Sequence, residues 1–337
     1  MASRRLNAPS IANPPPSTAA AAAEFRSHAL TLPRQAAGLR FDQALARVLP
    51  QYSRVLLSGW IAAGAVQVDG RPLRGKDRVL GGERVRIEAT LPAATAVAAE
   101  SLPLAVVYRD RSLLVIDKPA GLVVHPGAGN ARHTLQNALL ALDPKLALVP
   151  RAGLVHRLDK DTSGLLLVAR TREAYTALVA AMAARAIRRE YLALCTGVMT
   201  AGGTVDAPIG RHRSQRTRMA VRADGRRAVT HYRVVRRFRA HTLVRVMLDT
   251  GRTHQIRVHL AHMGFPLIGD PLYGGRRRLP PGGTAALAAE LRSFPRQALH
   301  AAHLALTHPL SSRELHWEAP LPQDLQRLLA ALEADRS

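Results

Sequence analysis

A short segment of mixed charge, residues 156–167, constrains this chain more than any other part of its sequence. Asp159 lies between two cations, Arg157 and Lys160, a turn signal follows at residues 161–164, and an apolar run comes next. This order predicts a loop that leads into a buried strand. A carboxylate beside fixed positive charge stays ionised. Asp159 is therefore a candidate nucleophile or base, and the alternative is a residue that only caps a turn.

The balance of charges indicates a polyanionic partner. The chain has 337 residues, of which 48 are Lys or Arg and 24 are Asp or Glu, and its formal net charge is +24. A GC-rich coding bias explains the preference for arginine over lysine, but it does not explain the excess of basic residues. Such a field attracts nucleic acid at long range. A membrane surface is the alternative, although no run reaches the roughly 18–20 apolar residues of a membrane span.

The single cysteine, Cys195, excludes an intrachain disulfide and a cysteine-based metal site, and it suits a reducing compartment. We therefore expect a cytoplasmic protein. Residues 1–28 are rich in alanine, proline and serine, which predicts a disordered tail. A mitochondrial transit peptide is the alternative, but the prolines at 14–16 would break the amphipathic helix that such a signal needs.

Residues 29–90 predict a small, basic α+β unit. The helical spacing of apolar residues predicts a helix over 41–49, and a second helix begins near Ser53, a suitable N-cap. Residues 66–68 alternate as a strand, and Asp69-Gly70 is a hairpin turn signal.

This unit resembles the RNA-binding domain of the ribosomal protein S4 type. The resemblance rests on Phe41-Asp42, Ser53-Arg54, Gly64, Val66 to Gly70 and Gly81 to Glu83. It implies that the unit binds RNA, and Arg40 and Arg54 are its candidate RNA contacts. The alternative is an accessory domain whose basic residues are only solvated.

The rest of the chain predicts a linker at 91–103, a larger domain at 104–330 and a C-terminal tail at 331–337. Apolar patterns predict strands at 113–116, 165–169, 191–195, 230–235 and 242–248, and a helix at 171–186. This order indicates an α+β domain, because the regular strand–helix alternation of a doubly wound sheet is missing.

A second informative segment, residues 249–259, ends a strand and opens a helix predicted over 253–263. The first turn of a helix offers free N–H groups and a partial positive charge, which suit a phosphate or a carboxylate. Arg252, His254 and Arg257 add side-chain donors at the same end. The alternative is a basic, solvated helix.

Arginine is concentrated between residues 201 and 260, a segment that contains 14 arginines and only three aspartates. Residues 210–218 contain no apolar side chain after the opening glycine, which predicts a loop. Its arginines, among them Arg216 and Arg218, are candidate contacts to an RNA backbone. A disordered basic loop is the alternative.

The usual templates for metal, nucleotide and hydrolase sites fail. His254 and His259 are five residues apart, which does not place them on one face of a helix, and no HExxH pattern occurs. Neither GxGxxG nor the complete P-loop pattern GxxxxGK[ST] is present, since Asp77 follows the glycines and lysine at 70–76. Ser163 lacks the GxSxG context of a hydrolase nucleophile. We therefore expect a reaction without metal or cofactor.

Asp159 and the helix at 253–263 belong to a wider pattern that resembles the RluA/RluD family of RNA pseudouridine synthases. The matching segments are Asp117 to Pro126, His156 to Gly164, Arg189 to Tyr191, Asp249 to His259, Gly264 to Gly274 and Arg296 to Ala301. The resemblance implies a catalytic domain on a mixed, mostly antiparallel sheet behind an S4-type domain. The N-terminal unit points to the RluD branch, which implies large-subunit (23S-type) rRNA and its helix 69 stem-loop, with pre-50S particles as the setting.

The resemblance also assigns roles. Asp159 is the essential aspartate, as nucleophile or as base, Tyr191 stacks on the uracil, and Arg257 pairs with Asp159. Arg157 fills the gap that the flipped uridine leaves in its stack. The other candidate RNA contacts in the catalytic domain are His156, Arg252, His254, Arg216 and Arg218.

A non-catalytic RNA-binding or ribosome-assembly factor with a synthase fold is the alternative function. The complete set of Asp159, Tyr191 and Arg257 argues against it. We expect a monomer without a membrane partner.

Overall fold

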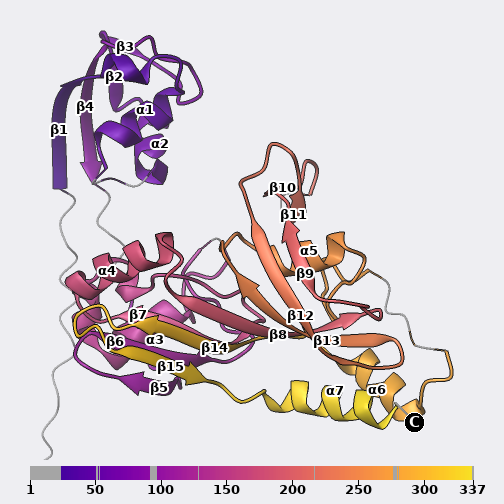
Figure 1. Ribbon diagram of the computed structural model, residues 1–337. Coiled ribbons are helices and arrows are strands. Elements are labelled where there is room, and N and C mark those ends of the chain that lie inside the picture. Colours follow the sequence, from indigo (N-terminus) through magenta and orange to yellow (C-terminus); the bar gives the residue numbers. More distant parts are fainter. Residues whose placement is uncertain are drawn as a thin grey trace, which may run out of the picture. The chain divides into compact units, whose positions relative to one another are not determined.

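The chain forms two compact units, Met1–Ala96 and Val97–Ser337, in the computed structural model shown in Figure 1. The structure describes residues 24–50, 52, 54–91, 97–127, 129–215, 217–275, 279 and 281–335. Each unit has its own hydrophobic core, and each is described by itself below.

The N-terminal unit packs two helices against a four-stranded antiparallel sheet with the strand order β1-β4-β2-β3. Its elements are β1 (Glu24–Thr31), η1 (Arg34–Ala36), α1 (Phe41–Val48), α2 (Arg54–Ala62), β2 (Val66–Val68), β3 (Arg71–Pro72) and β4 (Arg84–Leu91). Phe41 and Leu45 of α1 and Leu57 of α2 are fully buried beneath the sheet. The helical spacing over 41–49 therefore predicted the buried face of α1, whereas Leu57 of α2 was not among the residues that the sequence singled out.

Two details of this unit bear on the sequence predictions. Asp69 and Gly70 both have positive φ, 47° and 77°, so they form the tight hairpin turn that their sequence indicated. The tail predicted over 1–28 is wrong at its end, because β1 begins at Glu24 and pairs with β4 along its whole length. Ser53, the predicted N-cap, lies outside the described residues.

The C-terminal unit is built on a nine-stranded sheet with the order β5-β6-β7-β14-β8-β13-β12-β9, and β15 pairs with β14 beside this path (Figure 1). The strands are β5 (Ala105–Arg109), β6 (Leu113–Lys118), β7 (Ser163–Ala169), β8 (Arg188–Thr196), β9 (Gly203–Asp206), β12 (Val229–Arg237), β13 (His241–Leu248), β14 (Leu299–Thr307) and β15 (Glu314–Glu318). The pair β7–β14 is parallel and the other pairs are antiparallel. The predicted mixed, mostly antiparallel sheet is confirmed.

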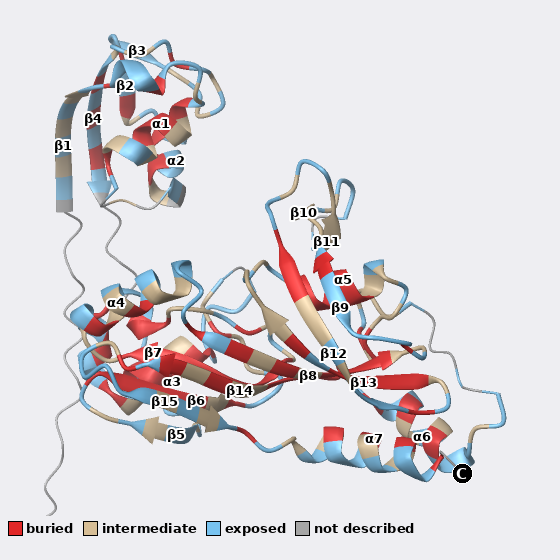
Figure 2. Ribbon diagram, in the orientation of Figure 1, coloured by how far each residue is buried: buried red, intermediate tan, exposed pale blue. Residues whose placement is uncertain are grey.

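Helices cover both faces of this sheet. They are α3 (Leu135–Leu142), η2 (Pro144–Leu148), η3 (Pro150–Gly153), α4 (Arg172–Ala183), α5 (Gln255–His262), α6 (Ala285–Ser293) and α7 (Gln323–Ala334). Leu166 of β7 packs in one core with α3 and α5, whereas its neighbour Leu167 packs in another core with α4. Every residue of β7 is buried for this reason (Figure 2), and a strand buried on both faces reads as a continuous apolar run.

The boundaries of the larger unit differ from the predicted ones. In the segment 97–103, which was predicted as part of a linker, Val97 packs against the catalytic core and Glu100 accepts a hydrogen bond from His133 N–H. At the other end, α7 continues to Ala334, so the predicted tail at 331–337 overlaps a helix. Within the described ranges, no helix is long and apolar enough to span a membrane.

A separate two-stranded hairpin projects from the larger unit, formed by β10 (Ile209–Arg211) and β11 (Met219–Val221). The basic loop predicted at 210–218 begins too early, because Gly210 and Arg211 belong to β10. Residues 212–218 connect the two strands, so the ends of this loop are held by antiparallel pairing.

Candidate active site

The loop that carries Asp159 ends in a tight turn. The carbonyl of Asp159 accepts a hydrogen bond from Thr162 N–H at 3.1 Å, and β7 begins at Ser163. The turn predicted at 161–164 is therefore two residues too late. Gly164 already belongs to the strand, with φ of +110°, and a Cβ there would stand 2.2 Å from the carbonyl oxygen of Ala301. Only glycine lets β7 and β14 approach this closely.

A buried lysine fixes the same turn from the other side. Lys118, the last residue of β6, is fully buried, and its Nζ donates to the carbonyls of Pro119 at 2.7 Å, Leu122 at 3.0 Å and Lys160 at 2.9 Å. The three N–H groups of the ammonium thus have three backbone acceptors. Lys118 ties the loop after β6 to the turn that holds Asp159.

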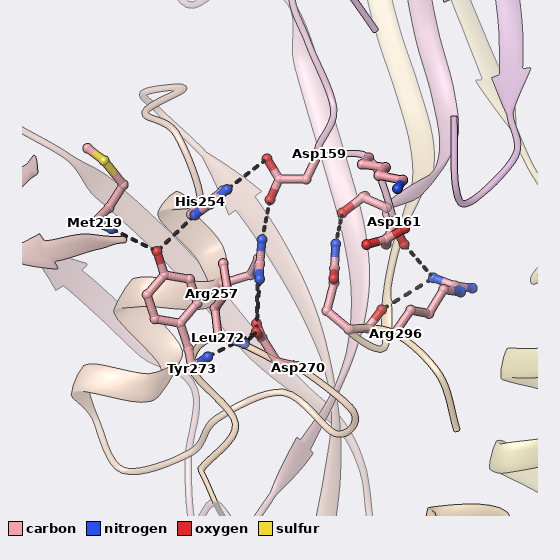
Figure 3. A network of polar contacts seen from close by, with 12 residues as sticks. Asp159, Asp161, Met219, His254, Arg257, Asp270, Leu272, Tyr273 and Arg296 are labelled. Atoms are coloured by element: carbon pink, nitrogen blue, oxygen red, sulfur yellow. Dashed lines mark hydrogen bonds and ion pairs between the residues drawn. The ribbon is translucent and has the colours of Figure 1, made fainter. Parts of the chain in front are cut away.

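Arg257 approaches Asp159 from α5, 98 residues further along the chain. Its Nη1 donates to Asp159 Oδ2 at 3.1 Å, while Nε and Nη2 hold Asp270 in a bidentate pair at 2.7 and 2.8 Å (Figure 3). Burial opposes the charge on this guanidinium, but Asp270 and Asp159 raise the pKa of Arg257 above its ordinary value. One cation therefore bridges two carboxylates.

Asp270 is the anchor of this arrangement. Burial alone would raise its pKa, but the hydrogen bonds and charge of Arg257 hold the pKa of Asp270 below its usual value. Its Oδ1 also accepts the N–H groups of Leu272 at 2.9 Å and Tyr273 at 3.0 Å. The carboxylate is thus fixed by four donors, and it orients Arg257 toward Asp159.

His254 faces the second oxygen of Asp159. Its Nε2 lies 3.9 Å from Asp159 Oδ1, and its Nδ1 lies 2.8 Å from the hydroxyl of Tyr273. That hydroxyl also accepts the N–H of Met219 at 2.9 Å, and its own proton can be donated to His254 Nδ1. The ring of Tyr273 also supports Arg257, whose guanidinium carbon lies 5.0 Å from the ring centroid.

Tyr191 lies on β8 at the floor of the site. It is 5% exposed, and burial raises its pKa, while the charge of Arg189 opposes this shift and the charge of Asp159 adds to it. The phenol is therefore neutral at ordinary pH, and its ring is an apolar surface beside the carboxylate. This surface suits stacking against a planar base.

These side chains line a cleft of about 490 Å³. The structure brings together in it seven of the residues selected from the sequence: Asp159, Tyr191, Arg257, Arg157, His156, Arg252 and His254. Arg157 is exposed at this cleft, where a side chain can meet RNA.

Two of these residues form hydrogen bonds with backbone groups of the protein. His156 Nε2 accepts the N–H of Leu167 at 3.0 Å, and burial lowers the pKa of His156 to about 3, so the ring is neutral. Its shielded Nδ1 has no partner among the described residues. Arg252 donates from Nε to the carbonyl of Arg227 at 3.0 Å.

The other candidate RNA contacts lie outside the cleft. Arg218, next to the start of β11, lies over the ring of Tyr273 at 5.6 Å, whereas Arg216 lies outside the described residues. In the N-terminal unit, Arg40 and Arg54 are exposed and both contact the carboxylate of Asp42, at 3.1 and 3.4 Å.

Sequence reasoning gave no role to Asp270, Tyr273 or Lys118, although each lies in a motif that it quoted. One signal was available for Asp270, which is the only acidic residue between Asp249 and Glu290. In the described part of the chain, no group of three or more His, Cys, Asp or Glu side chains could hold a metal ion.

Comparisons with known proteins agree with this geometry. The family model of RNA pseudouridylate synthases matches residues 112–262, and that of the S4 domain matches residues 39–85. A solved structure titled Human RNA Pseudouridylate Synthase Domain Containing 4 covers 68% of this chain and 93% of its own, with a TM-score of 0.54 and 27% identity. Human RNA Pseudouridylate Synthase Domain Containing 1 has a TM-score of 0.50 and 25% identity over 69% of this chain and 95% of its own.

Curated relatives extend the match to most of the chain. Ribosomal large subunit pseudouridine synthase D of Xanthomonas campestris is 57% identical over 90% of this chain and 92% of its own length. The proteins of that name from Pseudomonas aeruginosa and Escherichia coli K12 are 54% and 52% identical, over 91% and 88% of this chain and 96% and 92% of theirs. The chain therefore belongs to the RNA pseudouridine synthases, a family of isomerases, and carries an RNA-binding S4 domain ahead of its catalytic domain.

Proposed function

We propose that this enzyme converts uridines of large-subunit rRNA to pseudouridine, with the helix 69 stem-loop as its target. The support is the name shared by the curated relatives at 52–57% identity, together with the S4 domain and the net charge of +24. Pre-50S particles in the cytoplasm are the setting in which such RNA is available. A monomer suffices, because one chain supplies every residue of the cleft.

The single observation that carries the chemistry is the contact of Asp159 with Arg257 in a cleft floored by Tyr191. Pseudouridine formation breaks the bond between ribose C1′ and uracil N1, turns the base, joins C1′ to C5 and removes the C5 proton. Asp159 acts on the ribose, as nucleophile at C1′ or as base. Arg257 pairs with its carboxylate and orients it, and Tyr191 stacks on the base.

The uridine must leave its stack before Asp159 can reach its ribose. Flipping a base costs a few kcal/mol, and we assign the exposed Arg157 to the vacated position because a planar guanidinium stacks well on bases. Arg252 and His254 lie in the same cleft and contact the flipped nucleotide, whereas His156, which accepts the Leu167 N–H, holds the segment before Asp159. Arg218 and Arg216 beside it, and Arg40 and Arg54 in the S4 domain, contact the RNA backbone.

Asp159→Asn tests the assignment. Asparagine keeps the size of the side chain but cannot attack C1′ or accept a proton, so we expect the rate to fall about a thousandfold or more. The measurement is release of tritium from RNA labelled at uracil C5, together with RNA affinity, which should stay near that of the unmodified protein. Asp161→Asn, in the same turn, is the matched control. Full activity of Asp159→Asn would refute the proposal.

Removal of residues 1–96 tests the role of the S4 domain. Because each unit has its own core, the catalytic unit should remain folded. We expect RNA affinity to fall by roughly tenfold and the dependence of affinity on salt to become shallower, since fewer phosphates are neutralised. If affinity and target choice are unchanged, the N-terminal unit does not read the RNA.

A further inference from the structure

One buried cation in the cleft has no counter-ion. Arg189 on β8 is only 9% exposed, yet no described residue hydrogen-bonds or pairs with its guanidinium, and its Nε is fully shielded from solvent. The two other buried arginines in the described ranges behave differently. Arg257 holds Asp270, and Arg296 holds Asp324 at 2.6 and 2.9 Å. An unpaired buried charge is costly, so Arg189 requires an explanation.

No carboxylate of a described residue lies within ion-pair distance of the Arg189 guanidinium, and Asp159, in the same cleft, pairs with Arg257. Its neighbour Glu190 pairs with Arg245 at 3.4 Å. Asp249, which lines the same cleft, is taken by Arg185 at 3.3 Å and His231 at 3.2 Å. An anionic group of a bound ligand is therefore the acceptor that we consider for Arg189.

The position of Arg189 indicates that it contacts the base of the flipped nucleotide and not its phosphates. Arg189 and Tyr191 are two residues apart on one strand, so both side chains point to the same face of the sheet, and both line the cleft with Asp159. The Nη1 of Arg189 lies 3.4 Å from where a Cβ on Gly251 would stand, so the guanidinium reaches the loop before α5. A flipped base goes deepest into such a cleft, whereas its phosphates stay near the rim.

The reaction itself creates the anion that is needed. Asp159 and Asp270 with Arg257 sum to one negative charge before reaction. When the C1′–N1 bond breaks, its electron pair leaves with the uracil, and Asp159 either bonds to C1′ or takes a ribose proton. In both cases the negative charge passes from Asp159 to N1 and O2 of the uracil, while Arg257 stays paired with Asp270. The new anion then lacks a counter-ion.

We propose that Arg189 is a catalytic residue that donates to the detached uracil anion and holds it until C5 bonds to C1′. This rests on the proposed function. A hydrogen-bond donor that points to the place where negative charge develops lowers the barrier, because the folded protein already holds it in the right orientation. The bond from C5 to C1′ then uses the electron pair of the uracil, Asp159 recovers its charge, and a base removes the C5 proton.

The test compares Arg189→Met and Arg189→Lys with the unmodified protein under single-turnover conditions. Loss of one charge-stabilising donor costs about 100- to 1000-fold, so we expect that fall in tritium release for Arg189→Met, with RNA affinity within about twofold. Arg189→Lys, which keeps the charge, should recover part of the rate and guards against misfolding of the methionine variant. The control is Arg188→Met, which removes an exposed arginine next to Arg189 on β8.

A second RNA, with 5-fluorouridine at the target, separates catalysis from structure. Fluorine helps the ring to carry negative charge, so cleavage of this nucleotide should depend less on Arg189. We expect the defect of Arg189→Met to be at least about tenfold smaller, measured as disappearance of 5-fluorouridine from nuclease digests. Equal defects on both RNAs would mean a structural role and overturn the proposal.

Two further results would also overturn it. A wild-type rate for Arg189→Met would remove the residue from the reaction. A loss of RNA affinity that matches the loss of rate would identify a phosphate contact instead. In that case the slope of log affinity against log salt concentration would also decrease in magnitude by about one. If the unmodified protein releases no tritium from any rRNA fragment, the proposed function fails, and that outcome is distinct from a failure of Arg189 alone.

Discussion

At the scale of single residues, the catalytic carboxylate is oriented by groups that lie behind it. Arg257 touches one oxygen of Asp159, and Asp270 fixes Arg257. The other oxygen faces His254 Nε2, and this carboxylate favours the tautomer with the ring proton on Nε2. In that tautomer Nδ1 accepts the proton of the Tyr273 hydroxyl, which itself accepts the Met219 N–H.

Tyr273→Phe isolates this hydroxyl. Phenylalanine keeps the ring under Arg257 but removes the partner of His254 and of the Met219 N–H. A lost neutral hydrogen bond is worth about 1 kcal/mol, so we expect a single-turnover rate about fivefold lower with unchanged RNA affinity. Tritium release and filter binding measure the two quantities. Tyr175→Phe on α4 is the control, and a Tyr273→Phe enzyme as fast as this control would show that the hydrogen bond from Tyr273 to His254 is irrelevant.

At the scale of elements, the position of Asp159 depends on a junction between β6, β7 and β14. Gly164 lets β7 pass close to β14, and Lys118 ties the end of β6 to the carbonyl of Lys160. Burial lowers the pKa of Lys118 to about 7, yet its three carbonyl acceptors match the three N–H groups of the charged form. The junction thus holds the catalytic turn through backbone atoms.

Lys118→Met should loosen this junction. Methionine fills similar space but leaves the carbonyls of Pro119 and Leu122 without this donor, at about 1–3 kcal/mol for each unsatisfied group, whereas the Lys160 carbonyl keeps the N–H of Gly121. We expect the catalytic unit to lose roughly 2 kcal/mol or more of unfolding free energy, and its isomerisation rate to fall more than its RNA affinity. Urea unfolding and tritium release measure these changes. Lys145→Met, at an exposed lysine, should match the unmodified protein, and equal stability of the two variants would contradict the role of Lys118.

The elements also show where sequence reasoning succeeds and where it stops. The strand β7 and the helix α5 were predicted because their apolar periods reflect burial, which is a local record of tertiary structure. The start of β1 was missed because its pairing partner β4 lies far along the chain. The hydrogen bond from Met219 to Tyr273 joins residues 54 positions apart, and no local pattern encodes such a contact. The family resemblance, not periodicity, paired Asp159 with Arg257.

At the scale of the whole molecule, buried histidines should make the catalytic unit sensitive to acid. Burial is the largest cause of a lowered pKa at six histidines of this unit: His125, His156, His241, His254, His259 and His300. The folded protein keeps these rings neutral where the unfolded chain, with a histidine pKa of about 6.5, takes up protons.

The sign of the resulting pH dependence follows from this difference in proton binding. Below about pH 6.5 the unfolded state binds more protons, so stability is complete above that pH and is lost as pH falls toward the folded pKa, which is about 3 for His156. Each fully shifted histidine contributes up to about 1.4 kcal/mol per pH unit. We expect the urea midpoint of the catalytic unit to fall between about pH 7 and about pH 5.5, where carboxylates remain ionised. His300→Gln should reduce this slope, and a midpoint that stays constant or rises on acidification would contradict the argument.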